Sequence, residues 1–151
     1  MPVIIYKWMT LANIPPLSKE SPEITDVYAH IKEGLKKDPK FTVWEIPQYT
    51  SFGGRVSWTA SNLRVSIKGM IAYQVGKSLR MSTGIFKNGV PSVHIPTLTY
   101  SEYFPLDRII ACTFLPIPEE LSEYSKSELK VGRINGQKHQ VHLANLKWMK
   151  P

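Results

Sequence analysis

The sequence LRVSIKGMIAYQV, residues Leu63–Val75, decides the predicted fold. Its odd-numbered positions are almost all apolar, whereas its even-numbered positions include Arg64 and Lys68. Side chains of a β-strand alternate between the two faces of a sheet with a period of two residues. The pattern therefore predicts one long strand with an apolar face and a basic, hydrophilic face.

The segments on either side of this stretch predict two further antiparallel strands. Gly76–Ser78 has the composition of a three-residue hairpin loop and leads into a strand over Leu79–Lys87. Residues 55–59 (RVSWT) alternate in the same way and would place Trp58 opposite Val65. The solvent face of this three-stranded meander would carry four cations and one aromatic ring: Arg55, Arg64, Lys68, Arg80 and Phe86.

The central third of the chain carries no negative charge. Residues 48–101 contain no Asp or Glu, whereas residues 53–101 contain six Lys and Arg residues. Like charges placed directly across two strands destabilise the pair by roughly a few tenths of a kcal/mol or more. Either carboxylates from elsewhere in the fold balance this face, or the face stays positive and binds an anionic partner.

Length and composition predict one domain over residues 1–151. The chain has 42% hydrophobic and 11% aromatic residues, which is enough for a core and too much for a disordered chain. Its net charge of +7 favours polyanions, such as nucleic acid or an anionic membrane surface, as partners. No apolar run approaches the roughly 20 residues of a membrane span, and Cys112 is the only cysteine. We therefore expect a cytoplasmic protein, or one held peripherally at the inner face of a membrane.

The N-terminal third predicts one strand and one amphipathic helix. Val3–Leu11 has the composition of a strand. The helix is expected over about residues 22–37, with Ser21 as its N-cap, and Asp38-Pro39 would end it because the residue before proline resists helical geometry. Its apolar residues recur along one face: Ile24, Val27, Tyr28, Ile31 and Leu35.

Apolar runs and Asn-Gly pairs predict most of the remaining elements. Ile109–Leu115 has the composition of a buried strand, with Cys112 as an inert core thiol. Asn88-Gly89 and Asn135-Gly136 are typical of tight hairpin turns. The other expected elements are strands over Phe41–Tyr49, Val93–Tyr100, Leu129–Ile134 and Gln137–Trp148, and a helical turn beginning at Pro118. Together these predict a β-dominated α+β fold, a twisted antiparallel sheet or sandwich with one N-terminal helix.

The sequence has no catalytic or metal-binding motif. His139 and His142 form its only close His pair, and on a strand residues three apart point to opposite faces. No nucleophile, phosphate-loop or paired-carboxylate pattern is present, so we predict no catalytic residue, no cofactor and no metal ligand. A small enzyme with a dispersed site stays open as the third alternative.

The chain begins with a predicted strand over residues 3–11 and a polar connector. An amphipathic helix over residues 21–37 follows, and then a basic β-rich body from Phe41 onward. In this order, in size and in charge, the chain resembles the matrix proteins of negative-strand RNA viruses, the rhabdovirus type in particular. The resemblance implies a structural protein that self-assembles beneath a membrane, within a virion if it is viral. It also implies binding to anionic lipid and to the ribonucleoprotein through cationic faces.

The sequence thus favours a non-catalytic, basic binding and assembly protein that engages a polyanion and associates with itself. The polyanion would be an anionic membrane surface, a ribonucleoprotein or both. The alternative is a β-barrel protein that binds single-stranded nucleic acid. The predicted polyanion-binding residues are cations of the central strands and of the C-terminal hairpin: Arg55, Arg64, Lys68, Lys77, Arg80, Lys87, Lys130, Arg133, Lys138 and Lys147.

Overall fold

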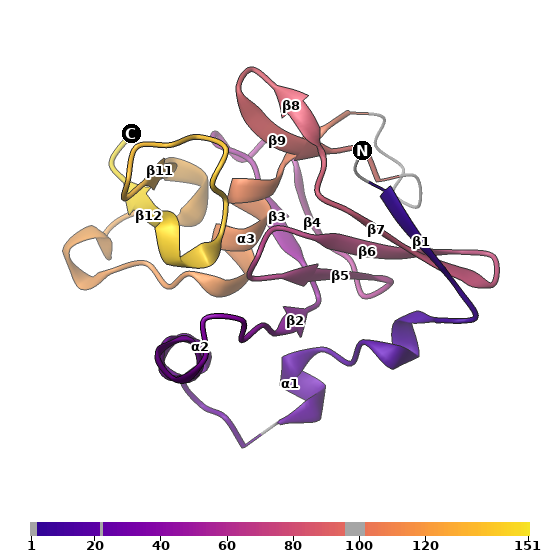
Figure 1. Cartoon of the computed structure of the whole chain (residues 1–151). Coiled ribbons are helices and arrows are strands. Elements are labelled where there is room, and N and C mark those ends of the chain that lie inside the picture. Colours follow the sequence, from indigo (N-terminus) through magenta and orange to yellow (C-terminus); the bar gives the residue numbers. More distant parts are fainter. Residues whose placement is uncertain (1–2, 22, 96–101) are drawn as a thin grey trace.

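The computed structural model describes residues 3–21, 23–95 and 102–151, and these residues form a β-dominated α+β fold. They contain twelve short strands in antiparallel sheets and three α-helices, which confirms the predicted fold class (Figure 1). The expected strand over Val93–Tyr100 lies partly outside the described residues. Of its described part, only Val93 is in a strand, as the last residue of β9 (Val90–Val93).

The largest sheet has five antiparallel strands. β6 (Ile71–Val75) lies at its centre, and β1 (Val3–Lys7) and β2 (Trp44–Glu45) are its outermost strands within the described chain. The strand order is β1, β7 (Ser78–Ser82), β6, β5 (Leu63–Ser66) and β2.

Three smaller sheets complete the β-structure. One pairs β3 (Gln48–Thr50) with β4 (Ser57–Thr59). A second has the order β10 (Phe104–Pro105), β9, β8 (Ile85–Lys87), and a third pairs β11 (Lys130–Arg133) with β12 (Leu146–Met149).

A buried helix, α3 (Leu106–Phe114), joins these sheets. It packs against β3, β5, β9, β10, β11 and β12, and Figure 1 shows it between the C-terminal hairpin and the other strands. The sequence had predicted a strand over Ile109–Leu115, and this prediction is wrong. A short apolar run has no helical periodicity when every side of the helix is covered, so a buried helix resembles a buried strand. Cys112 is buried as expected, and burial raises the pKa of its thiol.

The predicted amphipathic helix is α2 (Val27–Lys37), which begins about five residues later than expected. Asp26 is its N-cap in place of Ser21, because the Asp26 carboxylate accepts the Ala29 backbone N–H at 3.0 Å. The helix ends before Asp38, as predicted. Ile31 is fully buried, and Val27, Tyr28 and Leu35 pack partly buried against the main core. A four-residue helix, α1 (Leu17–Glu20), precedes it.

The expected long strand Leu63–Val75 is instead the hairpin formed by β5 and β6. Gly69 turns the chain with φ of +94°, and the Ser66 N–H donates to the Met70 carbonyl at 2.9 Å. A positive φ is easily adopted by glycine, so the turn falls at the one glycine of the run. The apolar alternation continues through the turn and therefore resembles a single strand.

Both faces of this hairpin are covered, and no basic solvent face exists there. Leu63 and Val65 enter the main core, whereas Ala72 packs in a second cluster with Ile14 and Leu79. The N-terminal segment supplies the cover of this second face through Tyr6, Met9 and Leu11. All four residues of β5, including Arg64 and Ser66, are consequently buried.

The neighbouring strands also pair differently from the predicted meander. β6 and β7 are joined by the two-residue turn Gly76-Lys77, so Val75 lies opposite Ser78. β4 pairs with β3 and not with β5, which places Trp58 opposite Tyr49, with ring centroids 5.5 Å apart.

The two Asn-Gly turns differ in outcome. Asn88-Gly89 forms the predicted tight hairpin between β8 and β9, with positive φ at both residues. The C-terminal hairpin also exists, but its return strand begins at Leu146 and not at Gln137. Residues 134–145 form a long connection that includes the 3-10 helix η4 (Leu143–Asn145). This connection lies beside the β5–β6 turn.

A buried guanidinium, that of Arg108 on α3, ties three segments together. It donates to the backbone carbonyls of Thr50, Lys126 and Leu129, the last at 2.8 Å from Nη1. It also lies 5.7 Å from the centre of the Trp148 ring on β12. The five donors of a guanidinium suit such a cluster of carbonyls.

We expect Arg108→Met to lower the free energy of unfolding by about 2–4 kcal/mol, because three buried or partly buried hydrogen bonds from a charged donor are lost. Arg55→Met is the matched control. The Arg55 side chain is mostly exposed and contacts only Glu102, so its loss should cost less than about 1 kcal/mol. Urea unfolding of both variants measures the difference, and equal changes would contradict the structural role of Arg108.

Candidate cation-lined pocket

The predicted cations do not share one sheet face, and Arg64 is the clearest correction. Its side chain is buried, with 8% of the residue surface exposed. Nε donates to the Ile14 carbonyl at 2.8 Å, and Nη1 donates to the carbonyls of Ser61 and Leu63 at 2.8 and 2.7 Å. Burial lowers the pKa of this guanidinium. Arg64 holds the N-terminal segment on the sheet and is not available to a surface ligand.

Two further predicted cations are paired with carboxylates from distant parts of the chain. Arg133 forms a buried ion pair with Asp107 at 2.8 Å, and Arg55 pairs with Glu102 at 3.4 Å. These are the only ion pairs among residues 3–21, 23–95 and 102–151. The alternative in which acids from elsewhere balance the cations thus applies to Arg55.

The other predicted cations are dispersed. Lys87 lies over the ring of Tyr103 at 4.6 Å, and Lys130 lies over the ring of Phe52 at 5.5 Å. Arg80 is half-buried on β7. The remaining exposed lysines lie in a sheet turn, in the C-terminal connection and on β12: Lys77, Lys138 and Lys147.

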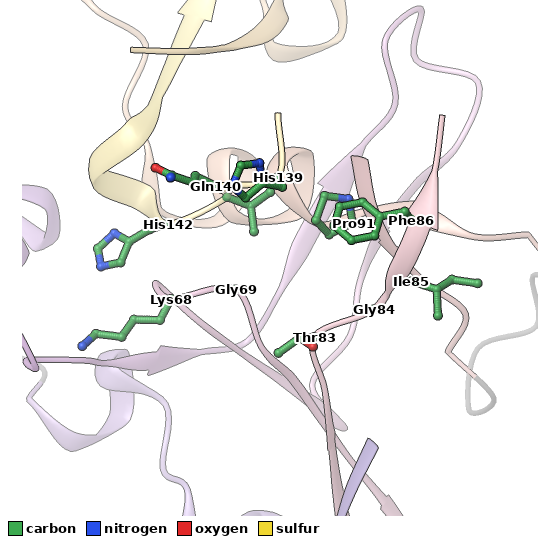
Figure 2. A pocket seen from close by; sticks show the side chains of 11 residues that line it. Lys68, Gly69, Thr83, Gly84, Ile85, Phe86, Pro91, His139, Gln140 and His142 are labelled. Atoms are coloured by element: carbon green, nitrogen blue, oxygen red, sulfur yellow. The ribbon is translucent and has the colours of Figure 1, made fainter. Parts of the chain in front are cut away.

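Lys68 lies at a pocket of about 460 Å³ (Figure 2), whereas Lys77, Arg133, Lys138 and Lys147 line other hollows of the surface. Three segments far apart in the sequence meet there: the β5–β6 turn, the β8–β9 hairpin with the connection before it, and the C-terminal connection. The lining side chains that matter chemically are Lys68, Thr83, Phe86, His139 and His142. The predicted sheet face shared by Lys68 and Phe86 does not exist, since Phe86 lies on β8 opposite Pro91, but both residues line this pocket.

Close backbone packing builds one wall of the pocket. A Cβ added to Gly69 would lie 2.8 Å from Cγ2 of Val141, so the β5–β6 turn can approach the C-terminal connection only as glycine. The Leu143 N–H donates to the Ile67 carbonyl at 2.8 Å and fixes this contact. His139 and His142 are thereby brought to the Lys68 side of the fold.

The opposite wall comes from the β8–β9 hairpin. Gly84 has φ of +80°, and an added Cβ would lie 2.5 Å from the Ser92 carbonyl oxygen, so this position also requires glycine. The chain then enters β8, where Phe86 lies directly opposite Pro91. Phe86 is 65% exposed, which is unusual for a ring of this size beside a pocket.

The electrostatics of the pocket favour an anion. Within the described lining residues there is no Asp or Glu. The Lys68 ammonium donates to the Pro39 carbonyl at 3.1 Å and remains exposed. His142 Nδ1 accepts the Ala144 N–H at 3.0 Å, which leaves Nε2 as the N–H donor of the neutral ring. Burial, and then the Lys68 charge, lower the pKa of His142, which favours the neutral ring.

A metal centre finds no support in this arrangement. Nowhere in the described parts of the chain do three or more His, Cys, Asp or Glu side chains gather as metal ligands. Sequence reasoning had noted His139 and His142 but had placed them on a strand, with opposite directions. Only the long connection after β11 brings both to one pocket, and no local pattern signals that it folds back onto Gly69.

A second exposed surface lies at the outer edge of the five-stranded sheet. Val3, Ile4 and Ile5 of β1 are each about half exposed, and Trp8 extends into solvent from a backbone with φ of +72°. Lys7, Trp8, Lys77 and Ser78 line a smaller hollow at the same end of the sheet.

Comparisons of the chain with known protein families, with curated proteins and with solved structures each gave no match. No helix in the described parts of the chain has the length and apolar character to cross a membrane.

We expect Lys68→Met to raise the pKa of His142, because the nearby positive charge that disfavours the imidazolium is removed. The pKa should still lie below the ordinary value, since the burial of His142 remains. Lys77→Met is the control, because Lys77 lies in the turn at the other end of β6. Titration of the His C–H resonances by NMR measures both. An unchanged His142 pKa in Lys68→Met would contradict the proximity of the two groups.

Proposed function

We propose that this protein is a non-catalytic binder of a phosphate-bearing polyanion, with the cation-lined pocket as its anchor. The observation that carries the proposal is a concave site that presents Lys68, His139 and His142 without a lining carboxylate. Such a site attracts phosphate, and it has no lining carboxylate that would repel an anionic polymer. The protein would act where such polymers occur, in the cytoplasm or at the inner face of a membrane.

The balance of surface charge supports the same proposal. The net charge is +7, and the described chain neutralises only Arg55 and Arg133 by ion pairs. Exposed lysines around the pocket, including Lys87 and Lys138, would guide a polyanion toward it. The Cδ atom of Lys138 would lie 3.8 Å from a Cβ at Gly89, so this lysine borders the β8–β9 turn that forms one wall.

The exposed outer strand β1 favours a second component of the proposal, self-association. An edge strand that carries exposed apolar side chains can pair with the same strand of another copy. Val3, Ile4 and Ile5 supply such side chains, at 50%, 45% and 52% exposure. Two copies joined in this way would present two pockets to one polymer, which strengthens binding through effective concentration.

We expect Lys68→Glu to weaken the binding of a single-stranded RNA or of heparin about tenfold or more and to flatten its salt dependence. Each phosphate contact contributes roughly 0.7 to the slope of log affinity against log salt for a single strand. Lys77→Glu changes the net charge equally at the opposite end of β6 and should have a smaller effect. Fluorescence anisotropy across a salt series measures the three proteins. Equal losses in both variants would show that net charge alone, and not the pocket, governs binding.

We expect the wild-type protein to form dimers with rising concentration, and Ile5→Lys to remain monomeric, because a charge on β1 opposes edge pairing. Thr10→Lys is the control, since Thr10 is exposed but lies beyond β1. Sedimentation equilibrium distinguishes the states. A wild-type protein that stays monomeric at all concentrations would remove the assembly component and leave polyanion binding untouched.

A further inference from the structure

The exposed ring of Phe86 has no role in the fold that accounts for its position. It is 65% exposed on the edge strand β8, whereas its cross-strand partner Pro91 is buried. Figure 2 shows the Phe86 ring beside the Pro91 ring at one end of the pocket. Residues that lie directly opposite each other in an antiparallel pair project to the same face, so Pro91 backs the Phe86 ring and the exposed part of the ring is an apolar surface beside the pocket.

The other end of the pocket carries the anion-binding groups. Lys68 and His142 lie there, and His139 lies between them and the Phe86–Pro91 end (Figure 2). The pocket thus has an aromatic end and a cationic end. Its volume of about 460 Å³ lies within the range of roughly 300–1,000 Å³ that small-molecule sites occupy.

A planar ring linked to a phosphate is the chemical group that matches both ends at once. An unpaired nucleobase stacks on an exposed aromatic side chain, whereas its phosphate accepts hydrogen bonds from cations. In a duplex the same base faces are covered by neighbouring base pairs. A lipid headgroup or a sulfated sugar brings the anion without the planar ring.

We propose that the pocket binds one nucleotide unit of a single-stranded nucleic acid, with its base stacked on Phe86. This inference rests on the proposed polyanion binding and identifies the polyanion. The adjacent phosphate accepts hydrogen bonds from the Lys68 ammonium and from the Nε2–H of His142. The stacking contact tolerates any base, because every base has a flat face.

The test compares ligands with and without bases. Wild-type protein, Phe86→Ala and Phe86→Trp are titrated into four ligands. These are a labelled ten-nucleotide oligouridylate, an abasic sugar–phosphate oligomer of equal length, a blunt RNA duplex and phosphatidylserine vesicles. Phe52→Ala is the matched control, because Phe52 is 51% exposed and lies beside a lysine, Lys130, outside the pocket. Phe86 is a surface residue, and circular dichroism confirms that each variant is folded.

We expect Phe86→Ala to weaken oligouridylate binding about 5- to 150-fold, the range of one lost base stack. Its affinity for the abasic oligomer should stay unchanged, Phe86→Trp should retain oligouridylate binding, and Phe52→Ala should behave like the wild type. The wild type should also prefer the oligouridylate to the duplex.

Three results would overturn this inference, and they separate it from the proposal beneath it. If the wild type binds the oligouridylate and the abasic oligomer equally and Phe86→Ala has no effect, the proposed base site is contradicted. The proposed polyanion binding would then still stand. Binding to vesicles without binding to the oligouridylate identifies a membrane as the partner. Absence of binding to all four ligands defeats the polyanion proposal itself.

Discussion

The hydrogen bonds of the Arg108 guanidinium are the constraint on which the rest of this fold depends. Buried carbonyls without donors are costly. Arg108 supplies donors to three carbonyls from separate segments, and it does so from a helix that contacts most of the sheets. Arg64 performs the same task between the N-terminal segment and β5. Part of the positive charge of the chain is therefore used inside the fold.

This use of arginine determines which cations remain for a ligand. Arg64 and Arg108 hold carbonyls, and Arg133 is paired with Asp107, so the positive surface charge comes mainly from lysines. Among these, Lys68 is distinguished by its place on a glycine turn that the C-terminal connection covers. Two glycines shape the pocket, because an added Cβ would meet the Val141 side chain at Gly69 and the Ser92 backbone at Gly84. The same α3 that buries Arg108 also contacts η4, which follows the pocket residues in the chain.

Local signals predicted a good part of the fold, and long-range contacts explain the rest. The β-dominated class, the end of α2 before Asp38 and the turn at Asn88-Gly89 depend on neighbouring residues and were predicted correctly. The hairpin at Leu63–Val75 was missed because its alternation continues through the Gly69 turn. The buried helix α3 was missed because its apolar run has no exposed face. The pocket was not predictable, since it requires residues 134–145 to fold back onto a turn some seventy residues earlier.

The location of the ligand is best tested by amide chemical shifts. A short single-stranded RNA is added to uniformly ¹⁵N-labelled protein, and the shifts of every assigned amide are followed to saturation. The largest changes should fall on Lys68-Gly69, on residues 84–86 and on residues 139–142, with little change along β5 and around Arg64. Changes concentrated on α2 or on β1, with the pocket amides unmoved, would contradict the account.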